Sequence, residues 1–128
     1  MTPEKLIERA KEAMQHAYAP YSGYKVGAAL LCADGTIYQG CNIENAAYGP
    51  TICAERSAIF NMLTHGEDRI ARVLALMPDG SCGAPCGACR ELMVQLMPGQ
   101  YRNVEIMMDY KEGTITTLGE LTPQWWIP

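Results

Sequence analysis

The segments Thr51-Ile-Cys-Ala-Glu-Arg56 and Ala84-Pro-Cys-Gly-Ala-Cys-Arg90 each stand at the start of a predicted helix. Cysteines three residues apart at a helix start share one face of that helix. If the two helix starts lie side by side on a sheet, the thiols of Cys53, Cys86 and Cys89 converge. Three thiolates can hold one zinc ion and leave its fourth position open for water, which is the arrangement of a catalytic zinc site.

Strands and helices alternate along the rest of the chain. Small apolar residues and alternating patterns predict strands at 26–32, 36–41, 70–77, 104–109 and 113–117. Helical spacing predicts a helix from Thr2-Pro3 to about His16–Tyr18 and two more at 52–65 and 86–97, with a short helical turn at 118–121. Asp34-Gly35 marks a tight hairpin turn between the first two strands.

This order of elements predicts an α/β fold, a three-layer α/β/α domain with a mixed sheet. The hairpin at 26–41 supplies an antiparallel pair, and the crossovers through the second and third helices are expected to supply parallel pairs. The chain has 128 residues without a repeat or a linker, which predicts a single domain over 1–128.

Composition narrows the classes of partner. The net charge is −4, with ten basic residues scattered among fourteen acidic ones. Binding of a polyanion requires clustered Lys and Arg, so we expect neither nucleic acid nor a membrane surface as partner. The sequence contains no run near the ~20 apolar residues of a membrane span, and its start lacks the pattern of a signal peptide. A cytoplasmic protein with a small ligand is the prediction.

The six cysteines admit other interpretations. Cys32, Cys41 and Cys82 are most simply buried or half-buried thiols. A structural zinc site would need a fourth protein ligand, from Cys82, His16 or His65. A redox-active C-x-x-C pair would leave the Cys-Ala-Glu tripeptide unexplained.

Glu55 and a nearby arginine complete the predicted site. Glu55 points away from the direction of Cys53 on the helix, so it can reach a metal-bound water as a general acid–base instead of binding the metal. Three thiolates and one Zn²⁺ sum to a charge of −1, which weakens the metal as a Lewis acid. Arg56 or Arg90 could offset this charge, and Arg56 is preferred because it lies one helical turn from Cys53.

These motifs identify a family. Cys53-Ala-Glu55 with Pro85-Cys-Gly-Ala-Cys89 resembles the zinc deaminase signature. The chain as a whole is similar to the cytidine deaminase family, in its branch with three cysteine ligands. Further matches are Tyr21-Ser22 with Val26-Gly-Ala-Ala-Leu30, Gly40-Cys-Asn-Ile-Glu-Asn-Ala46, and Arg56.

The resemblance implies zinc-dependent hydrolysis of cytidine or deoxycytidine to uridine or deoxyuridine and ammonia, by a five-stranded, homotetrameric protein. Cys53, Cys86 and Cys89 would bind zinc, and Glu55 would move protons while activated water attacks C4 of the ring. Asn42 and Glu44 would bind the sugar hydroxyls. Backbone groups at Ala54 and near 84–86 would hold the base and the departing ammonia. Without the deaminase motifs, Asn42 and Glu44 would be read as a polar turn in which Asn42 bonds its own backbone.

Three positions depart from the family pattern. Tyr24 stands where a phenylalanine usually contacts the substrate, and Glu91 replaces a glutamine. Trp126 aligns with a phenylalanine that caps the base in an adjacent subunit, although Trp125 and Trp126 could form a plain subunit contact. These departures motivate one alternative, a modified aminopyrimidine nucleoside as substrate. A non-catalytic zinc-binding protein is the other, and the intact Glu55 argues against it.

Overall fold

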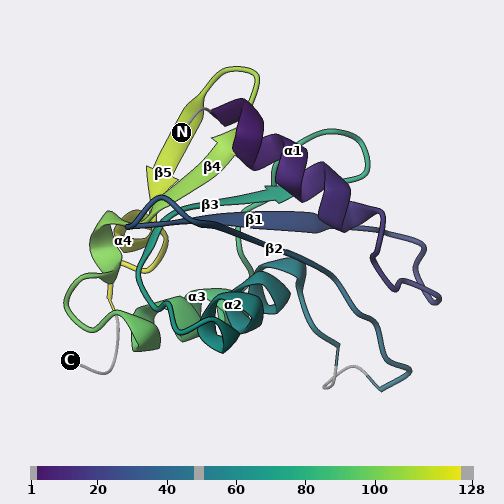
Figure 1. Ribbon diagram of the computed structural model, residues 1–128, viewed down its shortest axis with the longest axis horizontal. Helices are drawn as coiled ribbons and strands as arrows, with labels where there is room; N and C mark the ends of the chain where they lie inside the picture. Colours follow the sequence, from purple (N-terminus) through teal and green to yellow (C-terminus); the bar gives the residue numbers. More distant parts are fainter. Residues whose placement is uncertain (1–2, 48–50, 125–128) are drawn as a thin grey trace.

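A computed structural model describes residues 3–47 and 51–124 of the chain. Five strands form one mixed sheet in the order β2-β1-β3-β4-β5. The helix α1 covers one face of this sheet, and α2 and α3 cover the other, so that three layers are visible in Figure 1. The elements are α1 (Pro3–Met14), β1 (Gly27–Cys32), β2 (Ile37–Cys41), α2 (Ala54–Thr64), β3 (Ile70–Leu76), α3 (Gly87–Leu96), the 3₁₀ turn η1 (Tyr101–Asn103), β4 (Glu105–Asp109), β5 (Thr114–Thr117) and α4 (Leu118–Leu121).

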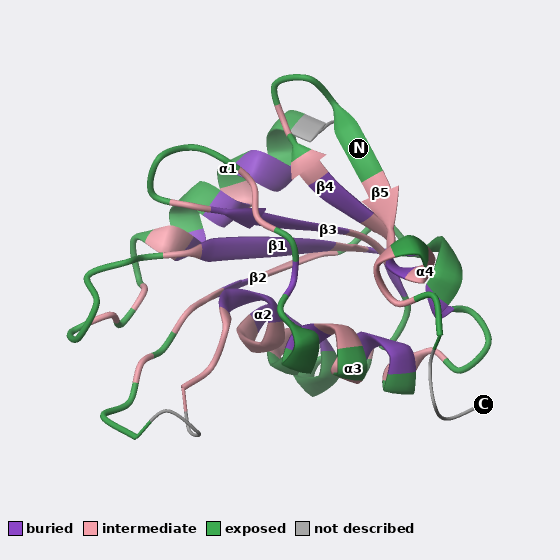
Figure 2. Cartoon of the chain, turned by 180° about the vertical axis from the view of Figure 1, so that it is seen from behind, coloured by how far each residue is buried: buried purple, intermediate pink, exposed green. Residues whose placement is uncertain are grey.

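The apolar core lies in two parts, one on each face of the sheet. Successive residues of a strand point to opposite faces, and the small residues of β1 follow this rule: Ala29 packs toward α1, whereas Ala28 and Leu30 pack toward α2 and α3. The central strands β1 and β3 are buried along most of their length, as Figure 2 shows. The predicted three-layer α/β/α class is confirmed.

The pairing of the strands corrects one expectation. β3 and β4 form the parallel pair, but β1 is antiparallel to both β2 and β3. The prediction that the crossover through α2 produces an adjacent parallel pair is therefore wrong. One edge of β1 is hydrogen-bonded to β2 in the hairpin, so β3 pairs with the other edge of β1. The connection from β2 to β3 through α2 therefore passes over β1.

Two element boundaries also differ, for local reasons. The first helix ends at Met14 instead of near His16–Tyr18, because the backbone of Tyr18 leaves the helix to donate to the carbonyl of Asn42 at 3.0 Å. The second helix begins at Ala54, and Cys53 occupies its N-cap position. The predicted cap at Thr2 lies outside the described residues.

Single-residue bridges join three loop segments beside the second helix. The strand-like residue Ile43 pairs with Tyr18 on one side and with Ile52 on the other. Ile52 directly precedes Cys53, so the segment 42–44 is hydrogen-bonded to the backbone that leads into α2. Within the described residues, no helix has the length and apolar character needed to cross a membrane.

Candidate metal centre and active site

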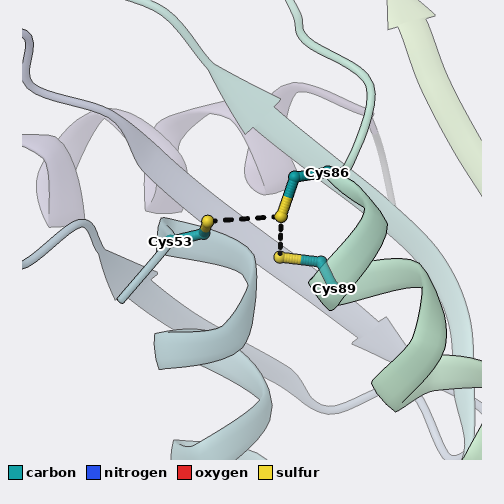
Figure 3. Close-up of side chains that lie close together, drawn as sticks. All are labelled: Cys53, Cys86 and Cys89. Carbon is teal, nitrogen blue, oxygen red and sulfur yellow. Dashed lines mark hydrogen bonds between the residues drawn. The ribbon is translucent and has the colours of Figure 1, made fainter. Parts of the chain in front are cut away.

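Three cysteine side chains meet between the starts of α2 and α3. Figure 3 shows Cys53 at the beginning of α2 and Cys86 and Cys89 on the first turn of α3, with their sulfurs facing one another. The Sγ atoms of Cys53 and Cys86 are 3.3 Å apart, as are those of Cys86 and Cys89. All three lie within 4.8 Å of one another. The structure thus brings together the three cysteines that were predicted from the sequence to converge.

The sulfur cluster fits zinc. Zinc–sulfur bonds of about 2.3 Å in a tetrahedron separate neighbouring sulfurs by about 3.8 Å, close to the distances observed here. Among the described residues, no fourth Cys, His, Asp or Glu joins the cluster. The geometry therefore fits a zinc site with an open position, and it gives the structural-zinc alternative no fourth ligand.

The other thiols and the histidine at the end of α2 lie outside the sulfur cluster. Cys32 is buried, Cys41 and Cys82 are half-buried, and none of the six cysteines forms a disulfide. His65 places Nδ1 2.8 Å from the carbonyl oxygen of Asn61 and its ring against Tyr38. The expectation of three buried or half-buried thiols is confirmed.

Both helix starts favour negative charge on the sulfurs. Cys53 and Cys86 are the N-cap residues of α2 and α3, with extended backbones and no side-chain cap bond. The positive end of each helix dipole therefore lies beside the sulfur of its N-cap cysteine. A hydrogen bond from Cys89, with smaller contributions from Cys86 and Arg56, lowers the pKa of Cys53 to about 5. Its bond to Cys53 and its burial raise the pKa of Cys89.

The two arginines beside the cluster have different partners. Arg56 donates from Nη2 to the Thr51 carbonyl at 2.8 Å, and its charge and hydrogen bond help to lower the pKa of Cys53. Arg90 donates from Nη1 to the carbonyl of Leu121 at 3.0 Å. The guanidinium of Arg56 is thus the one that faces the sulfurs, whereas that of Arg90 holds the segment after α4.

Glu55 is a buried carboxyl on the first turn of α2. Its residue surface is 5% exposed. Burial raises the pKa of Glu55 to about 7, and the nearby charge of Cys53 adds to this shift. A carboxyl with such a pKa can both accept and release a proton near neutral pH, as general acid–base chemistry requires.

A pocket of about 790 Å³ opens over the sulfur cluster. This volume is typical of pockets for small organic ligands. Glu44 and Arg56 belong to its wall, whereas Asn42, Tyr24 and the buried Ala54 are not among its lining residues; Trp126 lies outside the described residues. The lining residues are Tyr21, Ser22, Glu44, Asn45, Ala46, Thr51, Cys53, Arg56, Cys86 and Ala88.

Asn42 fixes the backbone of the loop before β1. Its Oδ1 accepts from the Val26 amide at 2.9 Å, and its Nδ2 donates to the Tyr24 carbonyl at 2.8 Å. The alternative in which Asn42 bonds its own turn is therefore wrong. The tyrosine ring of residue 24 is half exposed, and its backbone makes the contact with Asn42.

Glu44 is bound by a segment that the sequence analysis did not assign to the site. Its Oε1 accepts from the amides of Tyr21 and Ser22 at 3.0 and 3.1 Å, and its Oε2 accepts from the Ser22 hydroxyl. The match of Tyr21-Ser22 to the family pattern was the available signal, but it did not indicate a partner 22 residues away.

The fold places a three-sulfur cluster that could hold one metal ion beside a buried carboxyl. The family model described as "Cytidine and deoxycytidylate deaminase zinc-binding region" matches residues 1–104. The chain therefore belongs to the cytidine and deoxycytidylate deaminase family, which confirms the resemblance and identifies zinc as the cofactor.

Several named relatives cover nearly the whole chain. A cytidine deaminase of Sporosarcina psychrophila is 44% identical over 96% of this chain and 90% of its own length. One of Halalkalibacterium halodurans is 39% identical over 96% and 92%. The crystal structure of cytidine deaminase from Burkholderia pseudomallei superimposes with a TM-score of 0.85 and 42% identity, covering 98% of this chain and 100% of the other.

Proposed function

We propose that this chain hydrolyses cytidine and deoxycytidine to uridine and deoxyuridine, with release of ammonia. The observation that carries the proposal is the buried Glu55, whose pKa is raised to about 7, on the same helix start as the sulfur of Cys53. The names of the relatives support the same reaction. They favour neither a modified nucleoside as substrate nor a non-catalytic protein.

The chemistry follows from the residues around the open position. Cys53, Cys86 and Cys89 would hold zinc, which when bound supplies Lewis-acid activation of a water molecule. Glu55 would take one proton from this water and deliver it to N3 of the cytosine ring, while the water oxygen becomes bonded to C4. Glu55 would then take the second proton from the hydroxyl on C4 and deliver it to the exocyclic amine. The bond between C4 and the amine nitrogen breaks, ammonia leaves, and the oxygen stays on C4 as the carbonyl of uridine. Backbone groups at Ala54 and near 84–86 would hold the base.

Arg56 and the helix starts would keep the sulfur cluster reactive. The three thiolates otherwise reduce the positive charge available for activating water. A guanidinium beside Cys53 and two helix dipoles withdraw negative charge from the sulfurs. This is the role that we propose for Arg56.

The wall of the pocket favours a neutral nucleoside over a nucleotide. Glu44 contributes a carboxylate, and Arg56 is the only basic residue among the described lining residues. Its guanidinium is already engaged by the Thr51 carbonyl and by Cys53. A phosphate would find no free cation there. Glu44 would instead accept a sugar hydroxyl, and Asn42 would support the same wall.

Absorbance at the cytosine band tests the reaction. The zinc-loaded protein is incubated with cytidine, deoxycytidine, cytidine monophosphate and free cytosine in parallel, and ammonia is measured independently. Turnover of the two nucleosides is the expected result. Rapid turnover of free cytosine would contradict the binding of a sugar hydroxyl by Glu44. Inactivity on all four compounds would refute the proposed function.

Glu55→Gln provides the matched variant. The amide has the same shape but carries no transferable proton, so turnover is expected to fall by about 10²–10⁴-fold. The zinc content should stay at that of the wild type, because the three sulfurs are unchanged. Turnover at the normal rate by a zinc-loaded Gln variant would refute the role of Glu55.

We also propose a cytoplasmic homotetramer built from one domain over 1–128. Exposed large apolar side chains on α2 and in the loops before β1 and after β2 support self-association, namely Phe60, Leu63, Tyr18, Tyr21 and Ile43. The unpaired cysteines support a reducing compartment. Sedimentation equilibrium measures the assembly, and a monomer at micromolar concentration would contradict it. The base-capping role of Trp126 stays a prediction.

A further inference from the structure

The carboxylate of Glu44 has most of its acceptor positions occupied by one short segment. A carboxylate offers about four such positions, two on each oxygen. The amides of Tyr21 and Ser22 take both positions on Oε1, at 3.0 and 3.1 Å. The hydroxyl of Ser22 takes one position on Oε2. Among the residues that the structure describes, no other group bonds this carboxylate, so one position remains, and it is on Oε2.

The direction of the Ser22 hydroxyl is fixed as well. Its Oγ accepts from the amide of Tyr24 at 3.0 Å. With that side of the oxygen occupied, the hydroxyl proton is directed at Glu44. These bonds also stabilise the charged carboxylate, and they lower the pKa of Glu44, with the Ser22 hydroxyl as the largest cause.

The backbone beneath Glu44 is anchored relative to the metal ligands. The amide of Glu44 donates to the Tyr18 carbonyl at 2.8 Å, and Ile43 and Ile52 exchange backbone bonds of 2.8 and 2.9 Å. Ile52 is followed directly by Cys53. Ser22, Glu44 and Cys53 line the same pocket. The free position on Oε2 is therefore held at a fixed place on the pocket wall.

We propose that Ser22 is a positioning residue for Glu44: its hydroxyl leaves the carboxylate a single directed acceptor position, which receives one sugar hydroxyl of the nucleoside. This inference rests on the proposed function, because it concerns the substrate of the same site. A site built to bond a substrate hydroxyl discriminates against the analogue that lacks it, since the acceptor position is then left unpaired once the bound nucleoside covers the wall of the pocket. Ser22 thereby sets the dependence of turnover on the sugar hydroxyls.

The test compares the kinetics of the zinc-loaded wild type and Ser22→Ala with cytidine, 2′-deoxycytidine, 3′-deoxycytidine and 2′,3′-dideoxycytidine. The wild type should favour the substrates that carry one particular hydroxyl. In Ser22→Ala the KM for cytidine should rise about fivefold, with kcat changed by less than about twofold. The preference in kcat/KM for cytidine over the dideoxynucleoside should fall by about the same factor. Ser22→Thr keeps the hydroxyl and should keep the preference.

A matched control lies in the turn between β1 and β2. Thr36 bonds the Asp34 carboxylate through its amide and hydroxyl, and neither residue lines the pocket. Thr36→Ala should leave the sugar preference unchanged. In a Glu44→Ala background, adding Ser22→Ala should change the preference no further, because the group that Ser22 positions is gone.

Each failure has its own meaning. A wild type that does not deaminate cytidine refutes the proposed function. A wild type that deaminates all four nucleosides equally overturns only the role of Ser22. The same holds for a folded Ser22→Ala variant that keeps the wild-type sugar preference, or that loses kcat/KM equally on every substrate. If Ser22→Ala does not fold, Ser22→Cys, a weak donor of similar shape, must show an intermediate preference; an unchanged preference overturns the inference.

Discussion

Replacing Gly40 by alanine should damage the metal centre from a distance. Gly40 lies in β2 against α2, and a Cβ added there would sit 2.2 Å from the backbone nitrogen of Ala58 and 2.7 Å from the carbonyl carbon of Ser57. Both are backbone atoms, so no side-chain rotation relieves the contact. To reach ordinary contact at 3.4 Å, α2 has to move away from the sheet by about 1.2 Å.

This displacement affects both stability and zinc binding. Overpacking of this kind costs about 1–3 kcal/mol, and in a domain of this size each kcal/mol lowers the Tm by about 4 °C. α2 also carries Cys53, whose sulfur is 3.3 Å from that of Cys86. Zinc–ligand distances are held within about 0.2 Å, so a shift of α2 strains the site, and we expect zinc affinity to fall at least about tenfold.

Gly27→Ala is the matched control. A Cβ at Gly27 would lie 1.9 Å from the Ala10 carbonyl oxygen, so it presses on α1, on the face of the sheet opposite the sulfurs. It should lower the Tm similarly while leaving zinc affinity near that of the wild type. Tm is measured by calorimetry and zinc affinity by competition with a chromogenic chelator. Equal losses of zinc affinity in both variants, or wild-type affinity in Gly40→Ala, would show that the contact between β2 and α2 does not control the position of Cys53.

Two further predictions concern the sulfur cluster. Arg56→Ala should lower kcat at least about tenfold, because the thiolates lose their nearest cation. The zinc content and the Tm should change little. A loss of folding with no separate loss of kcat would contradict the charge-offset role of Arg56. After zinc is chelated under reducing conditions, iodoacetamide should label the exposed Cys86 and the half-buried Cys53, whose pKa is lowered to about 5, before the other thiols. The buried Cys32, whose pKa burial raises to about 12, should stay unlabelled until the protein unfolds. Peptide mass spectrometry measures this order, and early labelling of Cys32 would contradict it.

Local chemistry explains which features could be predicted from the sequence. Asp34-Gly35 determines a tight turn regardless of what surrounds it, and the hairpin is where it was predicted. A cysteine at a helix start has a fixed direction relative to its neighbour three residues later, so the cluster of Cys53, Cys86 and Cys89 followed once two helix starts were recognised. The place of Glu55 beside the sulfurs was predicted for the same reason, because its position on the helix turn is defined.

Features that depend on long-range pairing were not accessible in this way. The position of β1 between β2 and β3 depends on which strand edge β3 pairs with, and apolar patterns do not encode that choice. The bonds of Glu44 to Ser22 and of Asn42 to Val26 join residues 22 and 16 positions apart. Nothing in the composition of either segment indicates the other as its partner.

The site has two parts, the sulfurs with Glu55 and the wall with Glu44, and different kinds of contact hold each part in place. The sulfurs and Glu55 are placed by helix starts, which stay intact as long as α2 and α3 pack on the sheet. The wall that carries Glu44 is placed by single bridges at Tyr18 and Ile52 and by side-chain bonds to an exposed loop. A change in that loop can therefore alter which sugar is accepted without moving the metal ligands, whereas a change under α2 alters the chemistry for every substrate. Gly40→Ala and Ser22→Ala perturb these two parts separately. Gly40→Ala should lower zinc affinity and leave the sugar preference unchanged, whereas Ser22→Ala should lower the sugar preference and leave zinc affinity unchanged.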